Sequence, residues 1–162
     1  MYLHRNHYKL TRHFDAVQYK HTQIGYLMIV ITAILLVFYT SLLIVVGSDP
    51  VILAIMLFII FIVASFSTLT VSIDQKYLKI RFGYGLAGKQ FLLKDIHSVK
   101  TVRNHWYYGW GIRVWFWPTM WIYNISGFDA IEMVMKDGRR YRIGTDQPKE
   151  LEQAVLKAIR KQ

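Results

Sequence analysis

The sequence contains no cysteine, and this absence alone removes several classes of chemistry. Disulfide bonds, thiolate metal sites, thiol nucleophiles and Cys-x-x-Cys redox pairs are all excluded. Charge is also scarce, because charged residues make up 19% of the chain, against about a quarter in ordinary soluble proteins. The chain is 54% hydrophobic, so intrinsic disorder is excluded and a wholly soluble globule is disfavoured.

The shortage of charge is concentrated in one block. Between Ile24 and Ile73 the only charged side chain is Asp49, and lysine and arginine are absent. The basic excess lies on both sides of the block, with a net charge of +3 over residues 1–23 and +8 over residues 74–162. This distribution predicts a membrane segment between two basic flanks.

Two uncharged runs within the block predict transmembrane helices. The runs 24–46 and 51–69 would form helices of about 34 and 28 Å, close to the roughly 30 Å hydrocarbon core of a bilayer. The link 47–50 is Gly-Ser-Asp-Pro, in which glycine ends one helix, aspartate caps the next and proline suits its first turn. Because so short a link makes the helices antiparallel, residues 24–69 are predicted to form a transmembrane hairpin.

The orientation of this hairpin follows from the lysine and arginine residues that flank it and are missing from its link. Residues 1–23 are predicted to be a cytoplasmic basic juxtamembrane segment, and both termini are predicted to be cytoplasmic, with Ser48 and Asp49 outside. A cleaved signal peptide is rejected, because the first run is too long and no small-residue cleavage site follows it.

Residues 70–162 show the period of two that is typical of strands, and their last two predicted strands flank Asp137-Gly138, a strong hairpin signal. A helix is predicted over about 148–161, with Thr145 or Asp146 as its cap and an apolar stripe on one face. We expect short antiparallel strands closed by this one helix. The predicted strands cover 69–73, 78–82, 91–93, 96–102, 131–136 and 140–143.

Three stretches of this region resemble the bacterial pleckstrin-homology-like (PH-like) domain family: 109–113 (GWGIR), 123–127 (YNISG) and 142–148 (RIGTDQP). The resemblance covers about residues 70–160, and many family members place the domain behind two transmembrane helices. It implies a multi-pass protein of the bacterial cytoplasmic (inner) membrane, whose PH-like barrel or sandwich has two near-orthogonal antiparallel sheets and a capping C-terminal α-helix. It supplies no activity. The residues expected to determine the turns of this fold are Ser126, Gly127, Gly144 and Thr145.

A concentration of aromatic residues supplies the main candidate site. All five tryptophans lie between Trp106 and Trp121, and Trp and Tyr favour membrane interfaces, although some of these rings are expected to fill the small core. Residues 115–117 are consecutive aromatics, so on a strand they cannot all face a core, and lipid or protein must cover one apolar face. The predicted contact residues, on a loop or hairpin over 110–121, are Trp110, Arg113, Trp115, Phe116, Trp117 and Trp121.

A second candidate site is basic. Anionic headgroups attract lysine and arginine by about 1 kcal/mol each near a membrane surface. The ordinary excess of positive charge on the cytoplasmic side explains the same residues without binding, and it is the favoured interpretation. Nucleic-acid binding is not needed to explain them. The residues considered for headgroup contact are Lys76, Lys79, Arg81 and Lys89.

Catalytic and metal sites are disfavoured. Asp95 and His97 are two residues apart and would share one face of a strand, as a carboxylate and a base do, but Ser98 points the other way. Four histidines near the start of the chain have little carboxylate beside them, so an amphipathic segment at headgroup level is favoured and metal binding stays open. No catalytic residue, cofactor or small-molecule substrate is predicted. These histidines are His4, His7, His13 and His21.

The favoured function is a noncatalytic, membrane-anchored accessory or scaffold subunit of a larger membrane complex, with the aromatic segment as its contact. Its predicted partners are membrane lipids and either another integral membrane protein or a second copy of the chain. The alternative is a module that senses anionic lipid at the membrane surface, with the same aromatic residues inserted. An enzyme is the third and least favoured interpretation.

Overall fold

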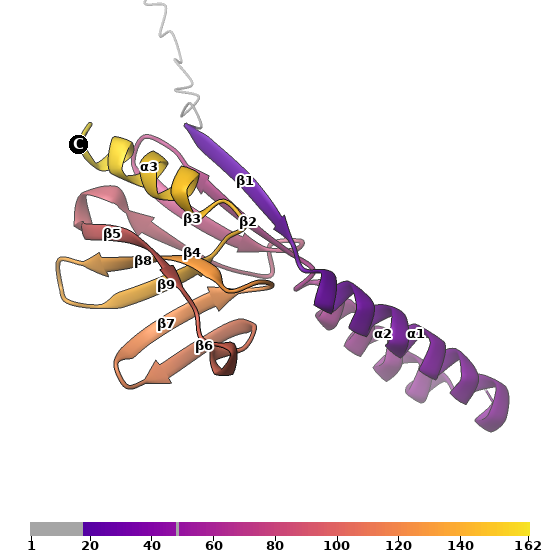
Figure 1. Cartoon of the computed structure of the whole chain (residues 1–162). Helices are drawn as coiled ribbons and strands as arrows, with labels where there is room; N and C mark the ends of the chain where they lie inside the picture. Colours follow the sequence, from indigo (N-terminus) through magenta and orange to yellow (C-terminus); the bar gives the residue numbers. More distant parts are fainter. Residues whose placement is uncertain (1–17, 48) are drawn as a thin grey trace, which may run out of the picture.

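The computed structural model describes residues 18–47 and 49–162. Two helices, α1 and α2, extend from a domain that is mostly β-sheet and ends in helix α3 (Figure 1). Most of the predicted juxtamembrane segment, including three of its histidines, lies outside the described residues, as does Ser48 of the link. The three histidines are His4, His7 and His13.

Helix α1 spans Tyr26–Val46. Among the described helices, it is the one that is long and apolar enough to cross a membrane, and its length is about 31 Å. It begins two residues later than predicted, because Tyr19–Ile24 forms strand β1 and Gly25 separates the strand from the helix. The predicted boundary at residue 24 is therefore wrong, and the end of the predicted juxtamembrane segment belongs to the β domain.

Helix α2, Pro50–Ala64, packs against α1. The carboxylate of Asp49 caps it by accepting hydrogen bonds from the Val51 and Ile52 amides at 2.8 and 3.0 Å, as the link predicts. The predicted end at residue 69 is wrong, because the chain leaves the helix after Ala64 and buries Leu69 in the core of the β domain. At about 22 Å, α2 is shorter than the predicted span.

The first sheet contains β1, β2 (Thr68–Ile73), β3 (Tyr77–Phe82) and β4 (Ala87–Leu92) in that order, with all neighbours antiparallel. The pairing of β1 with β2 runs from Tyr19–Ile73 to Ile24–Thr68. The two helices are therefore inserted between adjacent, hydrogen-bonded strands. β1 was not predicted, because its sequence YKHTQI is that of a polar edge strand without apolar alternation.

The second sheet has the order β5-β8-β9-β7-β6. The prediction of antiparallel strands throughout is wrong for β7 and β9, which are parallel, because the β8–β9 hairpin folds back and places β9 between β8 and β7. Two short 3₁₀ helices, η1 (Leu93–Asp95) and η2 (Trp106–Tyr108), flank β5. The five strands are β5 (Ile96–Arg103), β6 (Gly111–Phe116), β7 (Thr119–Asn124), β8 (Asp129–Met135) and β9 (Arg140–Gly144).

The core lies between the two sheets and beneath α3, Pro148–Ile159. Leu151, Val155 and Ala158 are buried against β5 and β8, so the C-terminal amphipathic helix is confirmed. Neither predicted cap is used: Gln147 occupies the cap position, and the Thr145 hydroxyl accepts a hydrogen bond from its amide at 3.1 Å. The C-terminal helix thus closes the sandwich of two sheets.

We call the end of the β domain next to α1 and α2 the helix end. Three contacts join it to helix α2 and to the strand ends that adjoin the helices. The Gly83 amide donates to the Thr68 carbonyl at 2.8 Å, the Ser126 hydroxyl donates to the Ile24 carbonyl at 3.1 Å, and the ring of Tyr84 stacks on Phe61 of α2. Because of the strand register, the last residues of β5 and the first residues of β6 also lie at the helix end. Its segments are 83–86, 103–106, 109–110 and 125–128.

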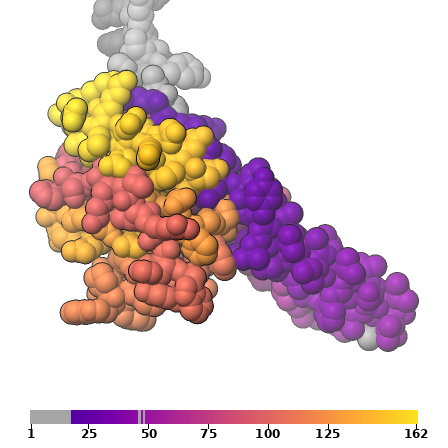
Figure 2. Space-filling model, in the orientation of Figure 1, coloured from indigo at the N-terminus to yellow at the C-terminus, as the bar shows by residue number. Residues whose placement is uncertain are grey.

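The opposite end of the β domain is called the far end. It contains the turn between β2 and β3, the turn between β6 and β7 and the turn between β8 and β9. The parallel pairing of Met120 with Arg140 places the β6–β7 turn beside the β8–β9 turn. Because a six-residue strand is about 20 Å long, the far end lies roughly one strand length from the helix end. Figure 2 shows the β6–β7 hairpin as a projection away from the helix pair.

Candidate functional site

The β6–β7 hairpin carries the two most exposed aromatic rings of the described chain. Phe116 is 85% exposed and Trp117 is 89% exposed, and both lie at the turn, at the far end of the domain. Both large rings are therefore exposed on the turn, and the rest of the described β domain does not cover them. This is the exposed apolar face that the consecutive aromatic residues predict.

Trp115 lies on the outer face of the second sheet, away from the core. Its half-buried ring packs against a small apolar cluster of Tyr108, Met120 and Ile122. Its indole N–H donates to the Trp117 carbonyl at 2.8 Å. This bond and the packing hold the turn in place, so Trp115 supports the exposed rings.

Trp121 lies on the opposite face of the hairpin, where Tyr123 stacks beside it at a centroid distance of 6.5 Å. The ammonium of Lys89 lies 5.8 Å from the Trp121 ring and 5.5 Å from the Tyr141 ring. Lys89 therefore makes cation–π contacts that join the two sheets. Together with Lys79 and Arg81, two of the other residues considered for headgroup contact, it also lines a pocket on strands β3 and β4.

Trp110 and Arg113 lie near the start of β6, at the helix end. The Arg113 Nε–H donates to the Trp110 carbonyl at 3.0 Å, and the Trp110 ring lies 6.5 Å from Phe128. The six predicted contact residues therefore do not form one continuous surface. Trp110 and the turn residues Phe116 and Trp117 lie at opposite ends of a strand pair.

The remaining basic candidates are Lys76, Lys79 and Arg81. Lys76 lies in the β2–β3 turn at the far end, whereas Lys79 and Arg81 project from the outer face of the first sheet. Lys79 forms an ion pair with Asp74 at 2.7 Å. Burial tends to raise the pKa of Asp74, but the ion pair and the Lys76 and Tyr77 amides outweigh burial and lower it. Lys79 and Arg81 share a face, and Lys76 lies apart from them.

A buried ion pair lies on the outer face of the second sheet. The Arg142 guanidinium contacts the Glu132 carboxylate at 2.8 and 2.9 Å, and Lys100 approaches the other carboxylate oxygen at 3.3 Å. Burial tends to raise the pKa of Glu132, but these two cations outweigh burial and lower it. The sequence carries a signal for this pair, because Glu132 and Arg142 face each other across the predicted Asp137-Gly138 hairpin.

Arg142 extends this network toward the helix end. Its guanidinium carbon lies 5.4 Å from the centre of the Tyr108 ring, and its Nη1 donates to the Asn104 side-chain carbonyl at 3.3 Å. The ion pair therefore fixes both η2 and the end of β5.

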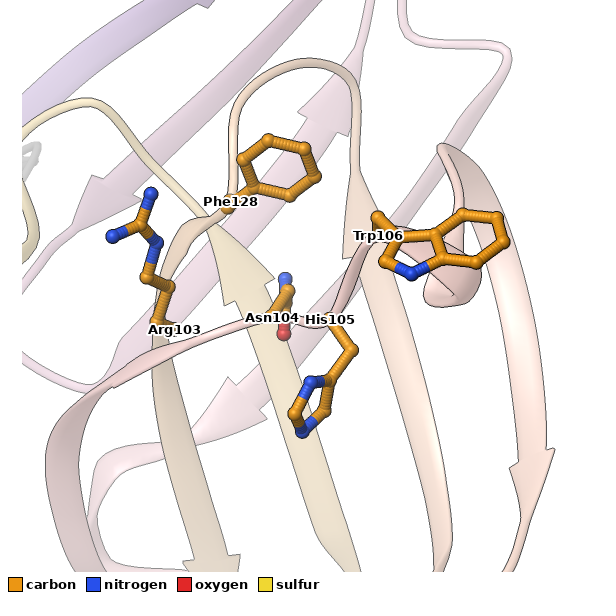
Figure 3. Close-up of a pocket in the computed structure, with 5 residues that line it drawn as sticks. All are labelled: Arg103, Asn104, His105, Trp106 and Phe128. Atoms are coloured by element: carbon orange, nitrogen blue, oxygen red, sulfur yellow. The ribbon is translucent and has the colours of Figure 1, made fainter.

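A pocket of about 300 Å³ opens at the helix end, between the end of β5, η2 and the loop before β8 (Figure 3). In Figure 3, Phe128 lies between Arg103 and Trp106, and the amide nitrogen of Asn104 points toward Phe128. His105 points away from Phe128 and stacks on Tyr107 at a centroid distance of 5.0 Å. The pocket is lined by Arg103, Asn104, His105, Trp106 and Phe128.

Asn104 is the buried polar residue of this pocket, with 5% of its surface exposed. Its backbone amide donates to the Phe128 carbonyl at 2.6 Å, but its side-chain N–H₂ is buried without a partner in the described chain. Sequence reasoning missed the pocket, because only the register of β5 with β8 brings Asn104 beside Phe128.

The predicted arrangement of Asp95 and His97 is wrong. Asp95 lies in η1 and His97 in β5, so they do not share a strand face, and no described hydrogen bond joins them. His21 lies in β1, 2.5 Å from the Asp146 carboxylate. Within residues 18–47 and 49–162, no group of three or more histidine, aspartate or glutamate side chains is placed to hold a metal ion.

Comparison of the chain with protein-family models, with characterised proteins and with solved structures finds no match.

Proposed function

We propose that this chain is a noncatalytic, membrane-anchored module that docks a partner membrane protein, as an accessory or scaffold subunit, through the far end of its β domain. The exposure of Phe116 and Trp117 on a supported turn carries this proposal. Aromatic rings at a rigid turn are typical anchors of protein interfaces. Their position, about one strand length from the helix end, favours a protein over the bilayer as the occupant.

The membrane part of the proposal is a transmembrane hairpin of α1 and α2. Its support is the hydrogen-bonded pairing of β1, before α1, with β2, after α2. Paired strands lie on one side of a membrane, so if α1 crosses the bilayer, α2 returns. The shortness of α2 requires local thinning of the bilayer or tilting of the pair. The flanking lysine and arginine residues favour a cytoplasmic position for the β domain.

The proposal includes a PH-like domain in a bacterial inner membrane. It rests on the three stretches that resemble the family, and it is compatible with two packed sheets closed by a C-terminal helix. Ser126 and Gly144 of those stretches have defined contacts. The Ser126 hydroxyl accepts a hydrogen bond from Gln23 at 3.0 Å, and a Cβ on Gly144 would lie 2.0 Å from the Asn124 side-chain oxygen.

The chemistry of the partner follows from the charges beside the exposed rings. Residues 136–140, next to the β6–β7 turn, contain Lys136, Arg139 and Arg140 against one acid, Asp137. The complementary surface is an apolar pocket bordered by carboxylates. The partner is therefore proposed to be a membrane protein with an acidic cytoplasmic face.

Site-specific photocrosslinking of the full chain in its own membranes tests the docking surface. A photoreactive amino acid at position 117 is expected to give one defined adduct, whereas the same amino acid at position 106 is the control at the helix end. Trp106 is a matched control, because it is 77% exposed. Equal adducts from the two positions, or none from position 117, would overturn the docking proposal.

Native mass after gentle detergent extraction distinguishes the kinds of partner. A heteromeric assembly that Trp117→Ala dissolves and Trp106→Ala retains would support the accessory-subunit proposal. A homo-oligomer with the same dependence would identify a second copy as the partner. A monomer with both side chains present would contradict the proposal.

The topology has its own test, because the chain has no cysteine of its own. A single cysteine at Ser48 is expected to react with a membrane-impermeant maleimide on intact cells, and one at Gln162 only after lysis. The reverse pattern would overturn the orientation. Labelling of both positions on intact cells would overturn the hairpin.

A second candidate function, sensing of anionic lipid, is favoured by one observation at the helix end. Tyr84 and Leu86 are exposed on the β3–β4 turn, and Tyr84 stacks on α2. These side chains lie at the level where the helices enter the β domain, and aromatic rings favour the bilayer interface. Two variants that each keep one tryptophan, with phenylalanine at the other four positions, test this candidate in nanodiscs. Brominated lipid is expected to quench the fluorescence of Trp106 in one variant and to leave that of Trp117 unchanged in the other.

A further inference from the structure

We infer that the pocket at the helix end binds the phosphate group of a membrane phospholipid. The inference rests on the membrane part of the proposed function and adds a ligand class and a site to it. It does not depend on the docking of a protein at the far end.

Arg103 supplies the positive charge of the site. No ion pair joins it to a carboxylate of the described chain, although Asp129 faces it across the β5–β8 ladder. Its guanidinium presents several N–H donors, and arginine binds phosphate oxygens in pairs of hydrogen bonds.

Asn104 supplies a donor whose direction is fixed. Its side-chain oxygen accepts from Arg142, so a flipped amide would place an N–H against a guanidinium and is excluded. The N–H₂ group therefore faces the pocket side, beneath Phe128 (Figure 3). A buried donor without a partner destabilises a protein by about 1–3 kcal/mol, and a phosphate oxygen entering beside Phe128 would satisfy it.

The walls and position of the pocket suit a lipid better than a small polar anion. Trp106 and Phe128 flank the two donors with apolar surface, which a glycerol backbone and the first acyl carbons would cover. The pocket lies at the helix end, close to where α1 leaves the β domain, and the loop before β8 is fixed to that point by Ser126. Lipid phosphates lie in this interfacial layer of a bilayer.

Ligand-induced thermal stabilisation of the full chain in detergent tests the site with three probes. The probes are dihexanoylphosphatidylglycerol below its micellar concentration, inorganic phosphate, and dihexanoylglycerol, which lacks the phosphate. We expect a saturable rise in Tm with the phospholipid, a much weaker one with inorganic phosphate and none with dihexanoylglycerol.

Two variants connect this effect to the pocket. Arg103→Gln is expected to weaken the apparent affinity for the phospholipid about tenfold, because a charged hydrogen bond is lost, and Arg103→Lys is expected to restore part of it. Arg160→Gln, which removes an exposed arginine at the end of α3, is the matched control and is expected to leave the affinity unchanged.

The outcomes separate the sources of the phosphate. Stabilisation by inorganic phosphate as strong as by the phospholipid, and lost in Arg103→Gln, would assign the site to a free phosphate group and overturn the lipid assignment. Three outcomes would overturn the site. They are equal stabilisation of Arg103→Gln and the unaltered chain by the phospholipid, stabilisation by dihexanoylglycerol as strong as by the phospholipid, and no saturable rise in Tm with the phospholipid.

Failure of this inference is distinguishable from failure of the docking proposal. Trp117→Ala is expected to abolish the crosslinked or native assembly and to keep the phospholipid effect, whereas Arg103→Gln is expected to do the reverse. Loss of both in either variant would contradict two independent sites.

Discussion

The two ends of the β domain differ in how their polar groups are satisfied. Four of the five buried side-chain atoms without a partner in the described chain lie toward the helix end, and only the Tyr19 hydroxyl lies toward the far end. At the far end, the turns satisfy themselves, as when Asp74 accepts from the Lys76 and Tyr77 amides. The four atoms at the helix end belong to Gln23, Asn104, Trp110 and Asn124.

Both ends expose apolar side chains, which at the helix end include Tyr84, Leu86 and Trp106. The far end exposes Phe116 and Trp117 on a turn that hydrogen bonds hold in place. The helix end combines exposed apolar side chains with buried polar groups that lack partners in the described chain, whereas the far end combines exposed rings with satisfied turns, and this difference indicates two kinds of surroundings. The helix end suits a layer rich in hydrogen-bonding headgroups, and the far end suits a protein surface.

The largest loss of stability is expected from a variant that breaks the ion-pair network supporting the helix end. Arg142→Leu leaves the buried carboxylate of Glu132 with only the partly exposed Lys100, and it is expected to lower the free energy of unfolding by about 3–5 kcal/mol. Chemical denaturation in detergent, followed by tryptophan fluorescence, measures it. Arg140→Leu, two residues away and exposed, is the control and is expected to have a small effect. Equal effects of the two variants would contradict the structural role of the ion pair.

Two glycines sharpen the comparison between the ends. Gly83 and Gly138 both have positive φ, but a Cβ on Gly83 would lie 2.0 Å from the Ser65 carbonyl, whereas nothing lies within 4 Å of one on Gly138. Gly83→Ala is expected to cost about 3 kcal/mol, and Gly138→Ala about 1 kcal/mol from backbone strain alone. The free energies of unfolding of both variants, measured under the same conditions, give the difference. Similar losses in the two variants would contradict the close approach of Gly83 to the Ser65 carbonyl at the helix end.

Acid is expected to weaken the fold through Asp74 and Glu132. The pKa values of both carboxyl groups are lowered in the folded chain, so their stabilising contribution is present above their ordinary pKa values near 4 and is lost as pH falls through the lowered values. Tm is therefore expected to fall as pH is lowered from about 5 to 3, and Glu132→Gln is expected to flatten this dependence. If Tm depends on pH as steeply in Glu132→Gln as in the unaltered chain, Glu132 does not contribute to the loss of stability in acid.

The smallest expected effect on stability is at the exposed turn. Trp117→Ala removes a side chain that is almost fully exposed, so the free energy of unfolding is expected to change by no more than about 0.5 kcal/mol. Trp115→Ala, which opens the packed cluster behind the turn, is expected to cost about 2 kcal/mol. A large loss of stability in Trp117→Ala would show that the ring serves the fold, and it would weaken the docking proposal.

Local chemistry predicted the elements that depend on neighbours in the sequence. The apolar stretch of α1, the cap at Asp49, the hairpin at Asp137-Gly138 and the stripe of α3 depend on periodicity or turn chemistry, and they occur in the structure. The end of α2 was mispredicted because hydrophobicity alone cannot distinguish a lipid-facing residue from a core residue such as Leu69.

The elements that depend on distant neighbours escaped prediction. Strand β1 is polar and exists because β2 pairs with it after both helices have intervened. The separation of Trp110 from Trp117 follows from hairpin register, and the pocket around Asn104 follows from the pairing of β5 with β8. Sequence alone therefore groups the six predicted contact residues, although the fold distributes them over two ends and two faces.

The pairing of β1 with β2 also sets an order for biosynthesis. Residues 25–67 separate the two strands, so β1 is made first and waits until α1 and α2 have been translated, an interval on the order of seconds at ordinary rates of synthesis. The polar sequence YKHTQI suits a strand that stays unpaired during this interval, because an unpaired apolar strand would aggregate. A fragment that begins after β2 would lose half of the first sheet, so the β domain and helices α1 and α2 are one folding unit.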